Sequence, residues 1–243
     1  KGIVLDIIQS AFFKLFGISW FSYSLHASVF NSIFAISTFF TFKKFDLETK
    51  YSFIYSVLAS ILMYPTYGTP FTDHSTAIFC MLSIYSLCLA IKTNKNIYWF
   101  FIPILIFLAF FTKQTPTGYI GILIIVISCL YLFRNIKKEI FIFGILGIAL
   151  SAVTFVLYVY LNDISLDDII IQYFLYPMSL GETRLEWLLP IEFQRFVIRH
   201  KLIYFALSVP FFLCFSTKSK TDFLISSFST TTSIIQSTSL IFF

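Results

Sequence analysis

Long apolar runs separated by short polar connections dominate this chain of 243 residues. A hydrocarbon core about 30 Å thick needs roughly 20 mostly apolar residues in helical form, because backbone polar groups must be paired within the segment. Six or seven segments meet this requirement, and the second is short. They cover residues 20–42, 51–66, 75–92, 97–113, 116–134, 139–161 and 200–216. The pattern predicts an all-α fold: a polytopic transmembrane helical bundle with about seven spans.

The stretch before the first apolar run has a different periodicity. Within residues 3–16, apolar positions recur at helical spacing, and Asp6, Gln9, Ser10 and Lys14 lie between them. This pattern predicts an amphipathic helix within residues 1–19 that lies in the membrane interface. A helix packed on the bundle is the alternative.

The organisation expected from these patterns is one transmembrane domain over residues 1–216. Within it, the segment 162–199 is a loop segment with the polarity of a soluble protein. The tail 217–243 is rich in Ser, Thr and Ile and is low in complexity, so it is assigned no role.

Composition agrees with a membrane protein. Apolar residues make up 58% of the chain and charged residues only 12%, and the mean hydropathy is +0.87. A soluble domain carries roughly a quarter of its residues charged. The net charge of +5 does not indicate nucleic-acid binding, because the basic residues form short clusters between apolar runs and not a stripe with interleaved aromatics.

The basic clusters occupy alternate connections, which predicts the orientation in the membrane. Short cytoplasmic connections carry an excess of Lys and Arg. One set of alternate connections contains Lys43, Lys44, Lys50, Lys92, Lys95, Arg134, Lys137, Lys138, Lys218 and Lys220. The other short connections contain only Lys113. The first set is therefore expected on the cytoplasmic side.

The opposite face is expected to carry the loop 64–74, with Asp73 and His74 next to a span. Ionisable side chains at membrane depth are costly, so they tend to face a cavity and have a partner. Pro65, Gly68 and Pro70 are typical of a rigid turn in this loop. An Asp just before a helix can also be a plain N-cap. Asp73 and His74 are the candidate catalytic residues, and capping does not exclude catalysis.

Cations on the same face are candidates for binding a phosphate group. Lys113 and Gln114 end the fourth predicted span, and the 162–199 segment contributes Arg184, Arg195 and Arg199. Snorkelling to the interface is the alternative for Lys113, and some Arg side chains are expected to pair with nearby Glu. His26 and Asn31, inside the first span, are expected to form hydrogen bonds between helices and not to be catalysts.

Two local strings, Gly68-Thr-Pro-Phe-Thr-Asp73-His74 and Phe110-Phe-Thr-Lys113-Gln114-Thr-Pro116, and the predicted topology resemble the GT-C membrane glycosyltransferases. Within this group the chain looks like the protein mannosyltransferase and aminoarabinose transferase type. The resemblance covers roughly residues 1–215, chiefly as topology.

The resemblance implies a multi-pass enzyme of the bacterial inner (plasma) membrane, with membrane lipid around it. Such an enzyme transfers a sugar from a polyprenyl-phosphate donor to an acceptor on the non-cytoplasmic face. The resemblance does not specify a cofactor, and a divalent metal is one candidate. The principal acidic base of the family lies in the first outer loop, which is expected to precede Lys1 in a fragment that lacks its N-terminus. Asp73 is then a contributor from the second outer loop.

Two other classes of protein share the multi-span pattern. A transporter or lipid flippase would carry an internal repeat and broken helices near the membrane midplane, whereas here the polar residues gather on one face. A non-catalytic membrane subunit is the third hypothesis. The enzyme hypothesis requires Asp73, Lys113 and the cations of residues 184–199 to converge on one cavity.

Overall fold

The computed structural model describes residues 2–65, 67–134 and 138–179. Within these ranges the chain forms eight α-helices and one π-helix, and no strand. The protein is an all-α helical bundle, as the hydropathy pattern predicts. The chain divides into two compact units, residues 1–163 and 164–243, and each is described by itself below. The assignment of residues 1–216 to one domain stays a prediction.

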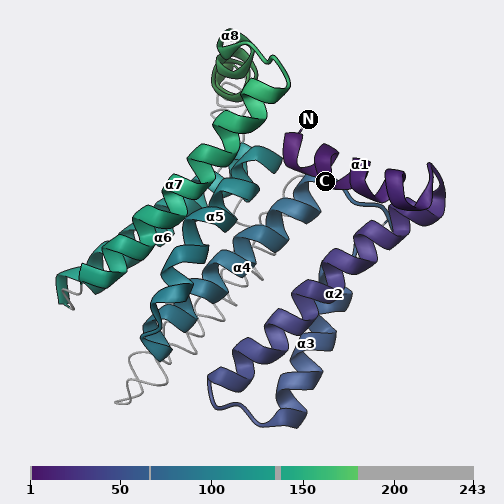
Figure 1. Ribbon diagram of the computed structural model, residues 1–243. Helices are drawn as coiled ribbons and strands as arrows, with labels where there is room; N and C mark the ends of the chain where they lie inside the picture. Colours follow the sequence, from purple (N-terminus) through teal and green to yellow (C-terminus); the bar gives the residue numbers. More distant parts are fainter. Residues whose placement is uncertain (1, 66, 135–137, 180–243) are drawn as a thin grey trace, which may run out of the picture. The chain divides into compact units, whose positions relative to one another are not determined.

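The first unit contains seven helices (Figure 1). They are α1 (Ile3–Phe16), α2 (Trp20–Lys44), α3 (Thr49–Met63), α4 (Thr72–Thr93), α5 (Asn96–Thr112), α6 (Gln114–Arg134) and α7 (Lys138–Leu161). Each predicted span up to residue 161 coincides with one of them. The predicted span 200–216 lies outside the described residues.

Four of the described helices, α2, α4, α6 and α7, are long and apolar enough to cross a membrane. The apolar helix α5 has 17 residues and α3 has 15, which correspond to about 26 Å and about 22 Å at 1.5 Å per residue. The short second span predicted from the sequence is therefore a short helix. The described helices have the length and composition of a multi-pass membrane protein.

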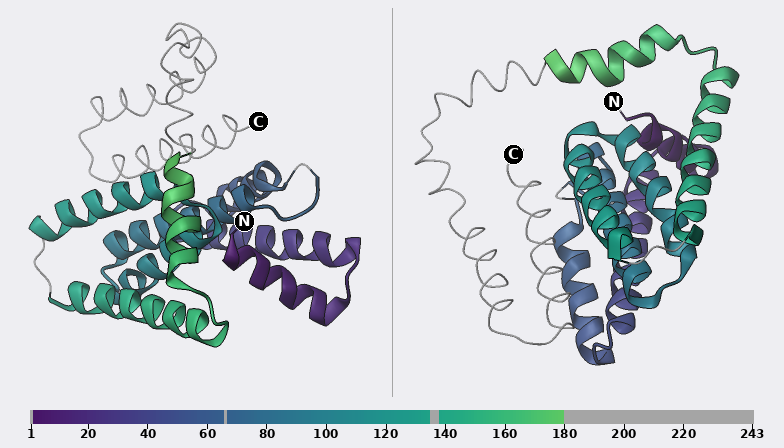
Figure 2. Two further views of the ribbon diagram at one scale, coloured as in Figure 1. Left: turned by 90° about the horizontal axis from the view of Figure 1, so that it is seen from above. Right: turned by 90° about the vertical axis from the view of Figure 1, so that its left-hand side faces the viewer.

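Helix α4 lies at the centre of the first unit, between α2 and α5 (Figures 1 and 2). Most of its side chains are buried, including Ser75, Thr76 and Ser83. By contrast, α6 and α7 expose large apolar side chains along much of their length, such as Ile125 and Val156. In water this exposure would be unfavourable, so α6 and α7 have surfaces suited to lipid.

Side-chain contacts identify one end of the bundle. Lys92, in the last turn of α4, forms an ion pair with Asp46 in the α2–α3 connection at 2.7 Å. Near the same end, the Tyr131 hydroxyl donates to Asn94 Oδ1 at 2.8 Å. This end, called the Lys92 end, carries basic connections that the sequence predicts to be cytoplasmic.

The predicted amphipathic helix is confirmed as α1, and it packs on the other end of the unit. The Gln9 Oε1 atom lies 2.7 Å from Nδ1 of His26 on α2, and the pair is buried. The ring of Phe12 stacks on His26 with centroids 4.8 Å apart. At the start of the helix, a Cβ atom added to Gly2 would lie 2.2 Å from the Thr112 carbonyl oxygen. Only glycine permits this close approach to α5. One face of α1 therefore packs on the bundle, which is the alternative that the sequence left open for this helix.

The second unit begins with α8 (Leu166–Ile170), which continues into the π-helix η1 (Ile171–Leu175). The Ser165 hydroxyl caps α8 by accepting from the Asp168 backbone N–H at 3.0 Å. The described start of the predicted loop segment 162–199 is therefore helical. Ser165 and Asp168 have the spacing of a helix N-terminal capping motif, which explains why a helix begins at this point.

Candidate functional site

The first turn of α4 carries Asp73 and His74. The helix begins at Thr72 with Phe71 as N-cap, and no side chain forms a capping hydrogen bond there. Asp73 is therefore not the N-cap that the sequence allowed, and it lies inside the helix and not in the preceding loop. A carboxylate in the first helical turn is stabilised by the helix dipole. The preceding turn is formed by Gly68, with φ of 66°, whose N–H donates to the Pro65 carbonyl at 2.8 Å.

Lys113 lies at the junction of two helices. Helix α5 ends at Thr112, α6 begins at Gln114, and Lys113 between them has extended backbone angles. The Thr117 hydroxyl donates to the Lys113 carbonyl at 2.8 Å, so that the break in the helix leaves this carbonyl satisfied. Because Lys113 is the single residue between two helices, the positions of α5 and α6 fix its backbone.

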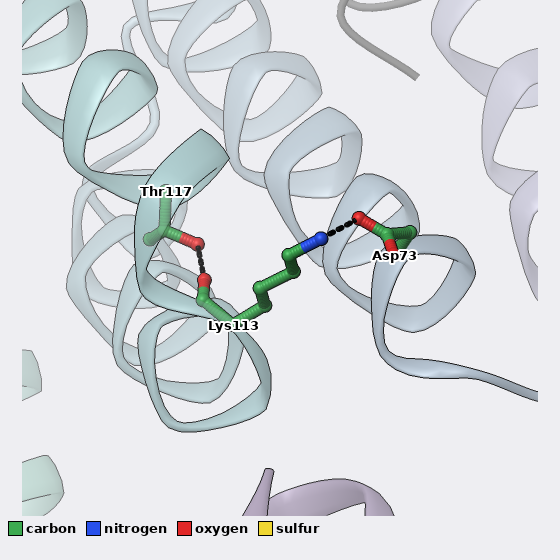
Figure 3. A network of polar contacts seen from close by, with 3 residues as sticks. All are labelled: Asp73, Lys113 and Thr117. Carbon is green, nitrogen blue, oxygen red and sulfur yellow. Dashed lines mark hydrogen bonds and ion pairs between the residues drawn. The ribbon is translucent and has the colours of Figure 1, made fainter. Parts of the chain in front are cut away.

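Lys113 and Asp73 form an ion pair (Figure 3). The Lys113 ammonium donates to Asp73 Oδ1, and the two side chains are 26% and 33% exposed respectively. Lys113 therefore has a specific partner on α4. This end of the bundle is called the Lys113 end. The structure brings together two of the predicted site residues that are 40 positions apart in the sequence.

His74 follows Asp73 in the first turn of α4 and is buried, with 4% exposure. Among the described residues, neither of its ring nitrogens has a hydrogen-bond partner. The same holds for Nε2 of His26, Nε2 of Gln9 and the hydroxyls of Ser75 and Thr76. Buried polar atoms are normally paired with protein or ordered water. This group of atoms gives the Lys113 end a hydrogen-bonding capacity that a polar ligand or water would satisfy.

His26 and Asn31 form the helix–helix hydrogen bonds predicted for them. His26 joins α2 to α1 through Gln9. Asn31 Nδ2 donates to the carbonyl and the hydroxyl of Ser60 on α3, at 2.9 and 2.8 Å. Their role in packing is confirmed.

A large apolar groove runs along α5 from Phe110 and Thr117, close in sequence to Lys113, to Trp99 and Ile140 at the opposite end of the helices. Lys113 and Asp73 do not line it. Helix α5 forms its floor, and α6 and α7, which diverge on either side of α5 in Figure 2, form its walls. The cavity measures about 820 Å³. At the Lys113 end its lining includes Phe110, Thr117 and Phe155, and farther along it includes Trp99 and Leu132. From Thr117 to Leu132 the α6 wall is about 22 Å long at 1.5 Å per residue.

Glycines keep this groove open. Gly118 and Gly144 line it, and a Cβ atom added to either would have no neighbour within 4 Å. Small side chains on the facing walls leave space that larger residues would fill. The hydropathy pattern does not indicate this groove, and the glycines of α6 and α7 are the signal in the sequence that could have indicated it.

The remaining predicted site residues are not assembled here. Gln114 is the first residue of α6 and is partly buried, but its side chain forms no hydrogen bond within the described part of the chain. Arg184, Arg195 and Arg199 lie outside the described residues. The convergence of these arginines with Lys113 therefore stays a prediction.

The described residues do not assemble a metal site. Asp73, His74 and His26 do not form a set of ligands, and no group of three or more His, Cys, Asp or Glu within residues 2–65, 67–134 and 138–179 is arranged to hold a metal ion. We therefore derive no chemical step through a divalent metal.

No family model, curated protein or solved structure matches the chain. The geometry of the Lys113 end and the apolar groove are therefore the basis for a functional proposal.

Proposed function

We propose that the protein is a membrane glycosyltransferase that moves a sugar from a polyprenyl-phosphate donor to an acceptor at the Lys113 end of the bundle. The observation that carries this proposal is the position of the groove relative to the ion pair. A long apolar groove starts at Thr117, one helical turn after Lys113. A ligand with a long apolar chain and a terminal phosphate would match an apolar groove that is followed by a cation.

The groove would hold the isoprenoid chain. Its length of about 22 Å along α6 follows from the helical rise, and its lining is almost entirely apolar. Burial of apolar surface contributes about 25 cal/mol per Å², so the chain would provide most of the binding energy. The phosphate would then lie at the open end, near the Lys113 ammonium.

Lys113 and Asp73 would divide the chemistry between them. In glycosyl transfer the acceptor oxygen forms a bond to the anomeric carbon, the bond from that carbon to the phosphate oxygen breaks, and the acceptor proton passes to a base. Lys113 would stabilise the negative charge of the leaving phosphate. Asp73 would line the acceptor side as the contributor from the second outer loop. The acceptor proton passes to a carboxylate within hydrogen-bond reach, a role that the resemblance gives chiefly to the first outer loop.

The ion pair between Lys113 and Asp73 has a defined role in this scheme. Asp73 holds the Lys113 ammonium at the junction of α5 and α6, one helical turn before Thr117 of the groove. A donor phosphate would compete for the ammonium and release Asp73 for the acceptor. The buried polar atoms of His74 and Ser75, the two residues that follow Asp73 in α4, would provide hydrogen bonds to acceptor hydroxyls.

The proposal is tested by Asp73→Asn and Lys113→Ala in membranes supplied with polyprenyl-phosphate-linked sugar. Each variant is expected to lower glycosyl transfer by about 100-fold or more, the usual size of acid–base and charge-stabilising contributions, while membrane insertion is unchanged. The matched controls are Asp46→Asn and Lys92→Ala, which break the ion pair at the other end of the bundle and should keep transfer near wild type. Full activity of both site variants would refute the proposal.

Binding measurements separate the phosphate contact from the groove. Lys113→Ala should weaken binding of undecaprenyl phosphate but not of undecaprenol, which lacks the phosphate. Gly118→Leu should weaken binding of both, because its side chain would project into the groove. Movement of polyprenyl phosphate across vesicles without any sugar transfer would favour a lipid flippase, which could use the same groove.

A further inference from the structure

A second cavity lies at the Lys113 end of the first unit, between α1 and the end of α7. It measures about 540 Å³, within the usual range for small-molecule sites. Its lining consists of Ile3, Asp6, Ile7, Ser10, Ala11 and Lys14 of α1, with Tyr158 and Asn162 opposite. Neither the sequence patterns nor the proposed glycosyl transfer assigns a role to it.

The α1 side of this cavity has two parallel stripes. Asp6, Ser10 and Lys14 recur every four residues and form a polar stripe, because residues at this spacing lie on one helix face. Ile3, Ile7 and Ala11 recur in the same way and form an apolar stripe beside it. Such an arrangement suits a ligand that is itself both polar and apolar.

The polar stripe carries two opposite charges, Asp6 and Lys14, that do not form an ion pair with each other. Within the described residues, neither Asp6 nor Lys14 takes part in an ion pair. The eight residues between them correspond to about 12 Å along the helix axis, and the Lys14 side chain inclines toward the N-terminus of the helix. The remaining gap is too long for a direct contact, but a molecule with an ammonium group and an anionic group could bridge it.

The surroundings of the cavity indicate that this molecule is a lipid. Ile7 and Leu15 of α1 are 46% and 76% exposed, and Val156 and Leu157 of α7 are 64% and 53% exposed. Ile7 and Leu15 lie next to the polar stripe on the surface of α1, and Val156 and Leu157 lie in the last turns of α7, next to Tyr158 of the cavity in the sequence. They would contact acyl chains, whereas a water-soluble ligand would leave them exposed to solvent.

We propose that the cavity between α1 and α7 binds the headgroup of a zwitterionic phospholipid with a primary ammonium, such as phosphatidylethanolamine. The Lys14 ammonium contacts the phosphate, and Asp6 accepts hydrogen bonds from the lipid ammonium. Ser10, Tyr158 and Asn162 offer polar groups between these two points. This site is independent of the glycosyl-transfer proposal.

The test measures lipid binding to the purified full chain in detergent. The probes are phosphatidylethanolamine, phosphatidylcholine, phosphatidylglycerol and soluble glycerophosphoethanolamine, which has the headgroup without acyl chains. Wild-type protein is expected to bind phosphatidylethanolamine about tenfold more tightly than the other three. Phosphatidylcholine is weaker because its quaternary ammonium cannot donate to Asp6, and phosphatidylglycerol is weaker because it lacks the cation.

Asp6→Lys provides the sharpest variant, because it places two cations along the stripe and should reverse the preference toward phosphatidylglycerol. Glu139→Lys is its matched control: Glu139, like Asp6, is an acidic residue in the first turn of a helix. It should leave the preference unchanged. Asp6 has no ion-pair partner among the described residues, so the variant should fold, which circular dichroism checks.

Three results would overturn the proposal. The first is equal wild-type affinity for the three phospholipids. The second is unchanged preference for phosphatidylethanolamine in Asp6→Lys. The third is equally tight binding of glycerophosphoethanolamine, which would show that a soluble molecule and not a lipid occupies the cavity.

Discussion

At the scale of single residues, two Asp–Lys pairs with different surroundings stabilise opposite ends of the first unit. Asp73 and Lys113 are partly buried, and Asp73 is followed in α4 by buried polar side chains that have no hydrogen-bond partner among the described residues. The Asp46 side chain is 79% exposed, and its partner Lys92 is 30% exposed. The same chemical pair therefore serves as a candidate site at one end and as a surface contact between helices at the other.

The surface pair predicts a pH dependence of stability. The hydrogen bond and charge of Lys92 hold the pKa of Asp46 below its usual value of 3.8. The folded pKa is the lower one, so the pair stabilises the fold above pH 3.8. Its contribution decreases as the pH falls from 3.8 through the folded pKa. Asp46→Asn should therefore lower the Tm at pH 7, and the difference from wild type should shrink under acid.

The control for this experiment is Asp163→Asn. Asp46 and Asp163 both have positive φ, 63° and 49°, which Asn tolerates. Within the described residues Asp163 forms no ion pair. A Tm difference for Asp46→Asn that stays constant from pH 7 into the acid range would contradict the role assigned to Lys92.

At the scale of elements, the close contact between α5 and α7 depends on a glycine. A Cβ atom added to Gly147 of α7 would lie 2.3 Å from the Phe100 carbonyl oxygen and 2.6 Å from Pro103 Cγ, both on α5. The contact between α5 and α7 is one of the most extensive in the unit. The same contact holds the α7 wall of the groove on its α5 floor.

We expect Gly147→Val to destabilise the protein by about 1–3 kcal/mol, the usual cost of an overpacked contact, because the backbone of α5 must move. Gly144→Val is the control, since it lies three residues earlier on α7 and has no neighbour within 4 Å of its added Cβ. The measurement is reversible unfolding in mixed micelles. Equal destabilisation by both substitutions would show that helix propensity and not packing is responsible.

At the scale of the whole molecule, the first unit has two chemically different ends. The Lys92 end carries basic connections, whereas the Lys113 end carries α1, the candidate site and the cavity between α1 and α7. The apolar groove runs between the two ends. The excess of basic residues at the Lys92 end predicts that this end faces the cytoplasm. Substrate chemistry and lipid binding would then take place at the outer membrane–water interface.

The orientation is tested with single cysteines in a background from which the native cysteines are removed. Tyr67→Cys, 74% exposed in wild type, should react with a membrane-impermeant thiol reagent on intact cells. Lys95→Cys, at the other end, should react only after the cells are permeabilised. The reverse pattern would place the candidate site in the cytoplasm and contradict the proposed outer-face reaction.

The sequence by itself determined the helices. An apolar run that crosses a membrane must pair its backbone polar groups within itself, and a helix does this. The predicted spans up to residue 161 therefore agree with α2 to α7. The spacing of Gln9, Ser10 and Lys14 between apolar positions likewise predicted α1. The predicted partners in packing, His26 and Asn31, were recognised because a polar side chain inside an apolar run needs a hydrogen bond.

Only the tertiary structure decided which distant residues meet. The pairing of Asp73 with Lys113, the burial of His74 and the groove between α5, α6 and α7 all depend on how helices pack. The way helices pack depends on the shapes of the residues at their contacts, such as the missing side chain of Gly147. The hydropathy pattern does not contain this information. The sequence therefore named Asp73, His74 and Lys113 as candidates, while the three-dimensional arrangement showed which of them are partners and which cavities lie beside them.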